Sequence, residues 1–122
     1  MITALIIDDH PENIEMLKAY LSLYKIKSIS TTSGRVAFAM AQDTPPDIIF
    51  SDLLMPDTTW DGYTTCEKFR THPLTAHIPI VAVTGAGDEK KAYEAGYDYF
   101  LQRPFQTDSL RKILTDMRLL PL

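Results

Sequence analysis

The chain has 122 residues, which is the length of one domain with a hydrophobic core of ordinary size. Apolar residues make up 45% of the sequence and charged residues 23%, as in soluble globular proteins. The net charge of −4 argues against direct binding of nucleic acid, and no apolar stretch approaches the roughly 18 residues of a transmembrane helix. No basic segment precedes the first apolar run, so the sequence predicts no signal peptide.

The single cysteine, Cys66, excludes an internal disulfide and fits a reducing, cytoplasmic compartment. We expect it to be a small buried residue of a helix rather than a catalytic thiol. The three histidines fall in separate predicted loops without a cluster of further ligands. We therefore expect solvated side chains rather than a zinc site at His10, His72 and His77.

Short apolar segments alternate with amphipathic segments along the whole chain. Runs rich in β-branched and aromatic residues predict strands at residues 2–8, 26–31, 47–52, 78–84 and 97–101. Helical periodicity and end signals predict helices at residues 11–24, 33–42, 63–70, 85–96 and 107–119. Pro11 suits the first turn of the first helix, and Thr107 is a candidate cap for the last one.

Five strands that alternate with five helices predict an α/β domain, with a parallel sheet covered on both faces. No internal repeat, low-complexity segment or linker interrupts the chain, so we expect one domain over residues 1–122. In a doubly wound sheet of order 2-1-3-4-5, the first and third strands are neighbours at the point where the strand order reverses. Such sheets bind ligands outside the carboxyl ends of their strands at that point.

Polar or charged side chains follow four of the five predicted strands, at Asp8 and Asp9, Asp52, Thr84 and Arg103. Three carboxylates would meet at the reversal point, and converging carboxylates favour a hard cation such as Mg²⁺. A hydroxyl and a guanidinium beside them suit a phosphoryl group, and an aspartate can itself be the nucleophile. The pattern therefore predicts phosphoryl transfer onto Asp52, which stands alone on the central strand, whereas Asp8 and Asp9 form a pair.

Four motifs in this order resemble the receiver domain of bacterial two-component response regulators. They are "IIDDHPEN", "DIIFSDLLMPD", "IPIVAVTG" and "AGYDYFLQRPF". The resemblance covers nearly the whole chain and implies a flavodoxin-like fold in which Asp8, Asp9, Asp52 and the backbone carbonyl of Leu54 hold Mg²⁺. It implies that Asp52 accepts a phosphoryl group from a histidine kinase or phosphotransfer protein, assisted by Thr84 and Arg103.

The same resemblance implies a switch rather than an enzyme, since the domain would only assist its own phosphorylation and dephosphorylation. Thr84 and Phe100 would report phosphorylation to the surface formed by residues 85–96, 97–101 and 107–119. That surface would contact a downstream protein or effector domain, and it is also a plausible surface for a homodimer. Aromatic residues cluster around it in the sequence, and we expect them to divide between core and partner surface: Tyr97, Tyr99, Phe100 and Phe105.

Three features depart from the family pattern. Arg103 stands where the family has lysine, which keeps the charge but not the geometry. Two extra residues separate "MP" from "DG" in "MPDTTWDG", and they bring Trp60 near the site, either to shield an acyl phosphate or, as we prefer, to cap the loop. Gly85 replaces the usual alanine and gives the backbone more freedom.

Other functions are less well supported by the sequence. Arg103 and the longer loop would suit a pseudo-receiver, a phosphorylation-independent interaction module. Asp8 and Asp9 could instead cap the first helix, although one acid would suffice for that. A haloacid-dehalogenase-like phosphatase would need two aspartates spaced as D-x-D, and a flavodoxin-like carrier would need a phosphate loop where this chain has adjacent acids.

Overall fold

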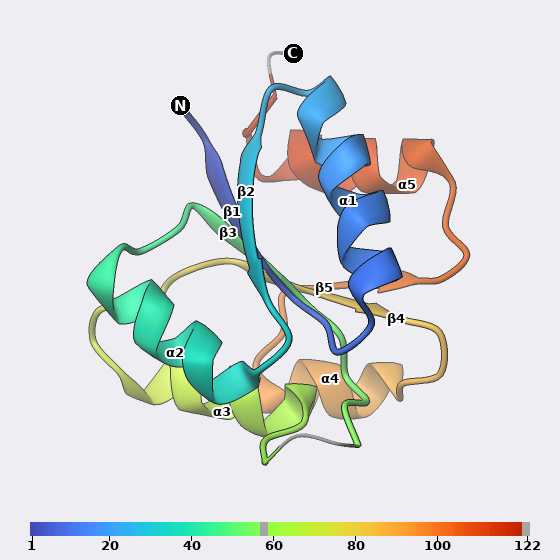
Figure 1. Ribbon diagram of the computed structural model, residues 1–122. Helices are drawn as coiled ribbons and strands as arrows, with labels where there is room; N and C mark the ends of the chain where they lie inside the picture. The colour runs from blue at the N-terminus through green and yellow to red at the C-terminus, as the bar shows by residue number, and fades with distance from the viewer. Residues whose placement is uncertain (57–58, 121–122) are drawn as a thin grey trace.

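The computed structural model describes residues 1–56 and 59–120 of the chain. Five parallel strands form one sheet in the order β2-β1-β3-β4-β5 (Figure 1). The strands are β1 Thr3–Ile7, β2 Lys27–Thr31, β3 Ile48–Ser51, β4 Ile80–Thr84 and β5 Tyr99–Gln102. The helices are α1 Pro11–Leu23, α2 Gly34–Asp43, α3 Gly62–Thr71, α4 Glu89–Ala95 and α5 Thr107–Asp116. The predicted α/β fold class and strand order are confirmed.

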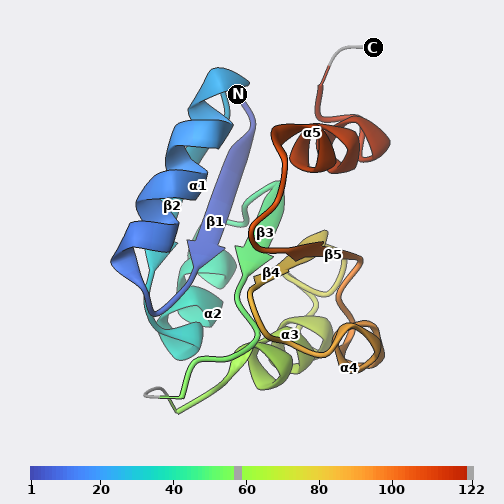
Figure 2. The same ribbon diagram turned by 90° about the vertical axis from the view of Figure 1, so that its right-hand side faces the viewer.

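Helices cover both faces of the sheet, with α1 and α5 on one face and α2, α3 and α4 on the other (Figure 2). Because side chains alternate along a strand, Leu5 and Ile7 of β1 pack toward α2 and α3, while Ala4 and Ile6 pack toward α1 and α5. Every residue of β3 and β4 is buried. This explains why the central strands read as continuous apolar runs rather than as alternating ones.

The helix ends agree with the sequence signals only in part. Pro11 is the first residue of α1, as predicted, and Gly96 ends α4 in a left-handed conformation with φ of 114°. Predictions at three helix ends were wrong, and one of them is the end of α5, which lies at Asp116 rather than at residue 119. The segment at 85–96 is helical only from Glu89, after Asp88, whose side chain accepts a hydrogen bond from Lys91 N–H at 3.1 Å. Thr107 does not cap α5, because it is already the first helical residue.

The strand register aligns the polar residues at one edge of the sheet. Ile7 pairs with Ser51, so the residues that follow them, Asp8 and Asp52, leave the sheet at the same level. The Asp52 N–H donates to the Ile7 carbonyl at 2.9 Å. On the other side, Arg103 N–H donates to the Thr84 carbonyl at 2.8 Å, directly after β5. No helix among the described residues is long and apolar enough to span a membrane.

Candidate functional site

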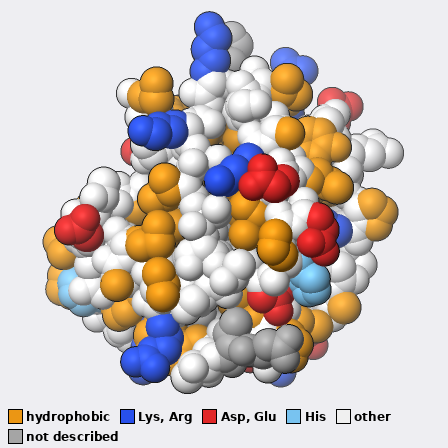
Figure 3. All heavy atoms as spheres, viewed as in Figure 1, with side chains coloured by type: hydrophobic (Ala, Val, Ile, Leu, Met, Phe, Trp, Pro, Cys, Tyr) orange, Lys and Arg blue, Asp and Glu red, His pale blue; other side chains and the backbone are white. Residues whose placement is uncertain are grey.

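Three aspartates meet at the carboxyl edge of β1 and β3. One side-chain atom from each of Asp8, Asp9, Asp52 and the adjacent His10 lies within 4.8 Å of the other three. Asp8 and Asp52 are almost fully buried, with 4% and 5% of their surface exposed. On the molecular surface, acidic side chains and a histidine lie side by side where the chain passes from β1 to α1 (Figure 3). The convergence expected from the sequence is therefore present.

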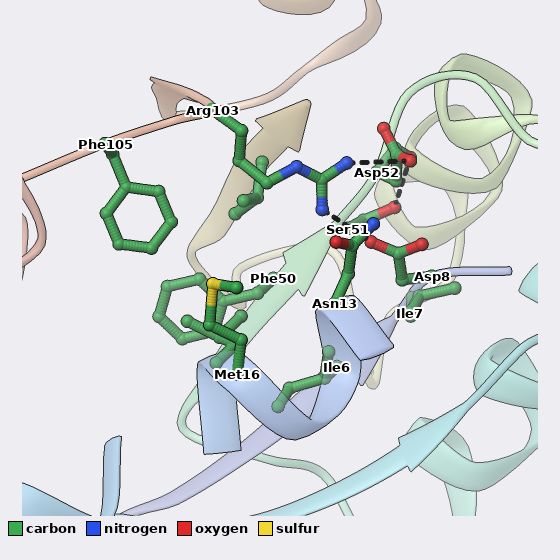
Figure 4. A pocket seen from close by; sticks show the side chains of 12 residues that line it. Ile6, Ile7, Asp8, Asn13, Met16, Phe50, Ser51, Asp52, Arg103 and Phe105 are labelled. Carbon is green, nitrogen blue, oxygen red and sulfur yellow. Dashed lines mark hydrogen bonds and ion pairs between the residues drawn. The ribbon is translucent and has the colours of Figure 1, made fainter. Parts of the chain in front are cut away.

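Arg103 reaches these acids from the end of β5. Its guanidinium points between Asp8 and Asp52, and it forms an ion pair with each of them (Figure 4). The Nη1–Asp8 Oδ2 distance is 2.8 Å and the Nη2–Asp52 Oδ2 distance is 3.2 Å. The planar fork of arginine can pair with two carboxylates at once, and here it does so. In this state Arg103 faces carboxylates rather than free space for a phosphoryl group.

The pKa of Asp52 is raised above its ordinary value. Burial is the main cause, and the neighbouring charge of Asp8 adds to it. Hydrogen bonding to Thr84, the charge of Arg103 and a 2.7 Å hydrogen bond from Leu53 N–H to Oδ1 act in the opposite direction. The groups that favour the ionised form of Asp52 thus do not fully offset the cost of its burial and the repulsion from Asp8. A further cation would favour the ionised form.

Asp9 and His10 form a second, more exposed pair. The Asp9 Oδ1 atom is buried and accepts no hydrogen bond from the described residues, although His10 Nδ1 lies 2.9 Å away as an ion-pair partner. The charge of Asp9 is the main cause of the raised pKa of His10, whose side chain is 55% exposed. The prediction that His10 is solvated holds, but the prediction that it lies in no ligand cluster was wrong. The signal was present in the sequence, since His10 directly follows two acids.

The donor set fits a hard divalent cation such as Mg²⁺. It offers three carboxylates from adjacent strand ends, and one buried oxygen of Asp9 accepts no hydrogen bond within the part of the chain that the structure describes. The hydrogen bonds do not support the helix-capping alternative for the acids, because His10 is the N-cap residue of α1 and Asp8 Oδ1 accepts from the His10 N–H at 2.9 Å rather than from an N–H of the first helical turn. The carbonyl of Leu54 follows Asp52 by two residues, and its role as a ligand stays a prediction.

Thr84 and Phe100, the two predicted switch residues, are buried to different degrees. Thr84 is 1% exposed, and its hydroxyl oxygen accepts a hydrogen bond from Gly87 N–H at 3.1 Å. Phe100 is half-buried and packs against the core beneath α2, α3 and α4. The predicted switch role of these two residues is a matter of motion and stays a prediction.

Comparisons with known proteins agree with this geometry. The family model described as the response regulator receiver domain matches residues 4–115. This chain belongs to that family. It is 38% identical over 103 residues to the response regulator PleD of Caulobacter vibrioides, which corresponds to 82% of this chain but only 22% of that protein. The receiver domain therefore spans about a fifth of the length of that relative.

Solved receiver structures superpose closely on this receiver domain. A signal receiver domain of a signal transduction histidine kinase from Syntrophus aciditrophicus gives a TM-score of 0.85 at 29% identity, covering 96% of this chain and 89% of that one. The receiver domain of the sensor histidine kinase PA1611 from Pseudomonas aeruginosa also gives 0.85, at 26% identity, covering 94% and 95%. That structure has a magnesium ion coordinated in its active-site cleft.

Trp60, just before α3, packs against side chains of α2 and α3 in this receiver domain. Its ring lies 5.9 Å from that of Phe38 on α2, and the cationic groups of Arg35 and Lys68 lie 5.9 and 5.7 Å from it. These contacts support loop capping rather than shielding of an acyl phosphate. Asp57 and Thr58 of the insertion lie outside the described residues.

The structure gives Cys66 and Gly85 no special role at the site. Cys66 is buried in α3, and burial raises the pKa of its thiol to about 12, so the expectation of an inert core cysteine is confirmed. A Cβ added at Gly85 would meet no atom within 4 Å, and the residue is not in the left-handed region. The glycine at this departure from the family is therefore not required by space or by backbone conformation.

The sequence analysis did not identify the residues of α1 that lie beside Arg103. A groove of about 370 Å³ lies between this helix and the segment after β5. It is lined by Asn13, Met16, Tyr20, Arg103, Pro104 and Phe105. In Figure 4, Met16 and Phe105 lie on the side of the Arg103 guanidinium that faces away from Asp8 and Asp52. The helical spacing of Asn13, Met16 and Tyr20 on one face was the available signal.

Proposed function

We propose that this receiver domain accepts a phosphoryl group on Asp52 from a phosphohistidine of a histidine kinase or phosphotransfer protein. The convergence of Asp8 and Asp9 on Asp52, whose pKa is raised by burial and by Asp8, is the observation that carries the proposal. Asp8, Asp9 and Asp52 would hold Mg²⁺, with the Leu54 carbonyl as a further ligand. When bound, the cation neutralises charge on the carboxylates and on the phosphoryl oxygens.

The side chains of the chain supply positioning and charge for this transfer. An Asp52 carboxylate oxygen forms the new P–O bond as the P–N bond to the donor imidazole breaks and the imidazole leaves. Leu53 N–H holds Oδ1 at 2.7 Å, which fixes the orientation of the carboxylate. Arg103 leaves Asp52 Oδ2 and follows the negative charge onto the phosphoryl oxygens, with the Thr84 hydroxyl as a second donor.

The groove beside α1 suits the donor protein, because it combines apolar contact area with direct access to Arg103. Phosphorylation would then bias the surface of α4, β5 and α5 through Thr84 and Phe100. A downstream protein, an effector domain or a second copy of the chain would read that surface. The domain acts as a cytoplasmic switch, not as an enzyme with a separate substrate.

One observation favours the pseudo-receiver as a second candidate. Arg103 already neutralises part of the charge of Asp8 and Asp52, so the fold has an internal cation at the site. A domain held in this state would serve as a constitutive interaction module.

Phosphorylation with a small donor separates the two functions. The protein is incubated with MgCl₂ and acetyl phosphate, and intact mass reports one added phosphate in the wild type and none in Asp52→Asn. Labelling of neither protein at any pH or time would favour the pseudo-receiver. Labelling of both would place the nucleophile elsewhere.

A further inference from the structure

A buried hydroxyl forms hydrogen bonds next to the segment that carries Asp52. It belongs to Tyr97, which follows Gly96 at the end of α4 and is 4% exposed. Burial raises the pKa of this phenol well above its ordinary value of 10, so the hydroxyl keeps its proton. A protonated phenol has one hydrogen to donate, and its buried position means that only protein groups can accept it.

The Tyr97 hydroxyl bonds to both ends of the loop that follows β3. Its Oη atom lies 2.9 Å from the carbonyl oxygen of Gly62 and 3.0 Å from Ser51 Oγ. Ser51 is the residue before Asp52, and Gly62 is the first residue of α3. One side chain from the α4–β5 connection therefore joins the end of β3 to the start of the next helix.

The backbone of Gly62 packs on Asp52 itself. A Cβ at Gly62 would overlap the carbonyl oxygen of Asp52, and Gly62 N–H donates to the Leu53 carbonyl at 2.8 Å. No side chain separates the two backbones, so a displacement of Gly62 is transmitted to Asp52 and Leu53. The hydroxyl that holds Gly62 thus acts on the phosphoacceptor through backbone contacts.

The hydroxyl protons at this point can satisfy both carbonyls at once. Ser51 Oγ donates to the carbonyl of Asp52 at 3.0 Å, so the Ser51 oxygen is free to accept from Tyr97. The single proton of Tyr97 is then shared between the carbonyl oxygen of Gly62 at 2.9 Å and Ser51 Oγ at 3.0 Å. In this arrangement each carbonyl next to the loop is fixed by one hydroxyl, and removal of either hydroxyl disturbs the other.

We propose that Tyr97 is a positioning residue for the phosphoacceptor. Its hydroxyl holds the two ends of the loop so that Asp52 presents its carboxylate toward Asp8 and Asp9. The role deepens the proposed function and rests on it for the meaning of the metal site. Because Tyr97 lies between α4 and β5, the same hydroxyl couples the geometry of Asp52 to the segment that precedes β5.

Tyr97→Phe removes the hydroxyl alone, and Tyr99→Phe is the matched control. Tyr99 lies two residues further on, is half-buried, and its hydroxyl makes no hydrogen bond with the described residues. In ¹⁵N-labelled protein, we expect the Gly62 amide of Tyr97→Phe to exchange about tenfold faster, because the Gly62 carbonyl loses its hydrogen bond from Tyr97 and the start of α3 opens more readily. Titration with MgCl₂ should give a Kd about threefold to tenfold weaker. Tyr99→Phe should match the wild type in both measurements.

A merely structural tyrosine would lower stability without changing the Mg²⁺ affinity of the folded variant. Wild-type exchange and affinity in Tyr97→Phe, or equal changes in Tyr99→Phe, would overturn the proposal. If Tyr97→Phe does not fold, Ser51→Ala removes the hydroxyl partner from the strand side, and the same two changes are expected there. A wild-type result for Ser51→Ala would then refute the role.

The exchange rate of the Gly62 amide can be interpreted independently of the labelling experiment with acetyl phosphate. Absence of phosphate on wild-type Asp52 would contradict the proposed function but leave the exchange rate of Gly62 as a test of Tyr97. Unchanged exchange at Gly62 would contradict the role of Tyr97 whether or not Asp52 is labelled.

Discussion

Arg103 Nη1 lies 2.8 Å from Asp8 Oδ2, although 95 residues separate the two in the sequence and β3 and β4 lie between their strands. The ion pair places a protein cation beside the carboxylate that the proposed function assigns to Mg²⁺. A bound Mg²⁺ would favour the ionised aspartates as Arg103 does, so we expect the two cations to compete for these carboxylates. Much of the behaviour of this receiver domain should follow from that competition.

Replacement of Arg103 should therefore affect two ligands in opposite directions. Arg103→Ala frees Oδ2 of Asp8 and of Asp52, so Mg²⁺ should bind at least about fivefold more tightly. Beryllofluoride, which mimics the phosphoryl group, should bind more weakly, because it loses a charged donor. Calorimetric titration of both ligands measures the two effects. Arg111→Ala, which removes an exposed charge from α5, is the control. An equal loss of affinity for both ligands in Arg103→Ala would contradict the role of Arg103.

Asp52→Asn should stabilise the metal-free protein at neutral pH. Since the pKa of Asp52 is raised on folding, its contribution to stability is full below its unfolded pKa and is lost as the pH rises through the folded pKa. The ionised carboxylate is thus unfavourable at pH 7, and asparagine removes that cost. Thermal unfolding in EDTA should give a higher Tm for the variant, with a difference that shrinks as the pH falls.

A matched surface change tests this explanation. Glu15→Gln removes an exposed charge from α1 and should leave the Tm nearly unchanged. The gain from Asp52→Asn should also disappear with saturating MgCl₂, because the cation compensates the wild-type carboxylate. A lower Tm for Asp52→Asn in EDTA would mean that the ion pair with Arg103 outweighs the cost of burial.

His10 should make Mg²⁺ binding depend on pH. Its pKa is raised mainly by the charge of Asp9, so protonated His10 stabilises the metal-free fold below its ordinary pKa, and this is lost as the pH rises through the raised one. A proton on His10 and Mg²⁺ on Asp9 oppose each other, so the Mg²⁺ affinity should rise with pH through that range. His10→Ala should flatten the profile, whereas His77→Ala, in the loop before β4, should leave it unchanged.

The sequence was sufficient to predict the fold and the positions of the acids. The buried strands read as apolar runs, and Asp8 and Asp52 end two of them, so the parallel order 2-1-3-4-5 was enough to bring them together. Hydrophobic periodicity predicts where a strand ends, and the strand order then predicts which strand ends are neighbours.

The contacts of the side chains could not be predicted in the same way. Arg103 was expected to face a phosphoryl group, and only the rotamer in the structure shows that it pairs with Asp8 and Asp52 instead. The link between Tyr97 and Ser51 joins residues 46 apart, and an aromatic residue next to a strand carries no mark of its hydroxyl partner. Such contacts depend on packing of several elements at once, not on local pattern.

Arg70 should be essential for stability, although it lies away from the acids. Its guanidinium donates to the carbonyls of Gly96, Ala76 and Ile78 and pairs with Asp98 at 2.7 Å. Arg70→Ala leaves these acceptors without their donor and should lower the free energy of unfolding by about 2–4 kcal/mol. Urea denaturation measures the loss. Arg70→Lys cannot reproduce the fork and should recover little, whereas exposed Arg118 should tolerate alanine.

Gly62 and Gly85 offer a matched pair of glycines at opposite extremes of available space. A Cβ at Gly62 would overlap the carbonyl oxygen of Asp52, whereas a Cβ at Gly85 would meet nothing within 4 Å. Gly62→Ala must push the start of α3 away from Asp52 and should cost about 1–3 kcal/mol of unfolding free energy. Gly85→Ala should be neutral or stabilising by up to about 1 kcal/mol, because alanine restricts the unfolded chain.

The same pair also tests how closely the site depends on the backbone at Asp52. Beyond its loss of stability, Gly62→Ala should slow labelling by acetyl phosphate at a temperature where the variant is still folded, because the Asp52 backbone moves with Gly62. Gly85→Ala should be labelled at the wild-type rate. If folded Gly62→Ala is also labelled at that rate, the carboxylate keeps its position without the contact between Gly62 and the Asp52 carbonyl.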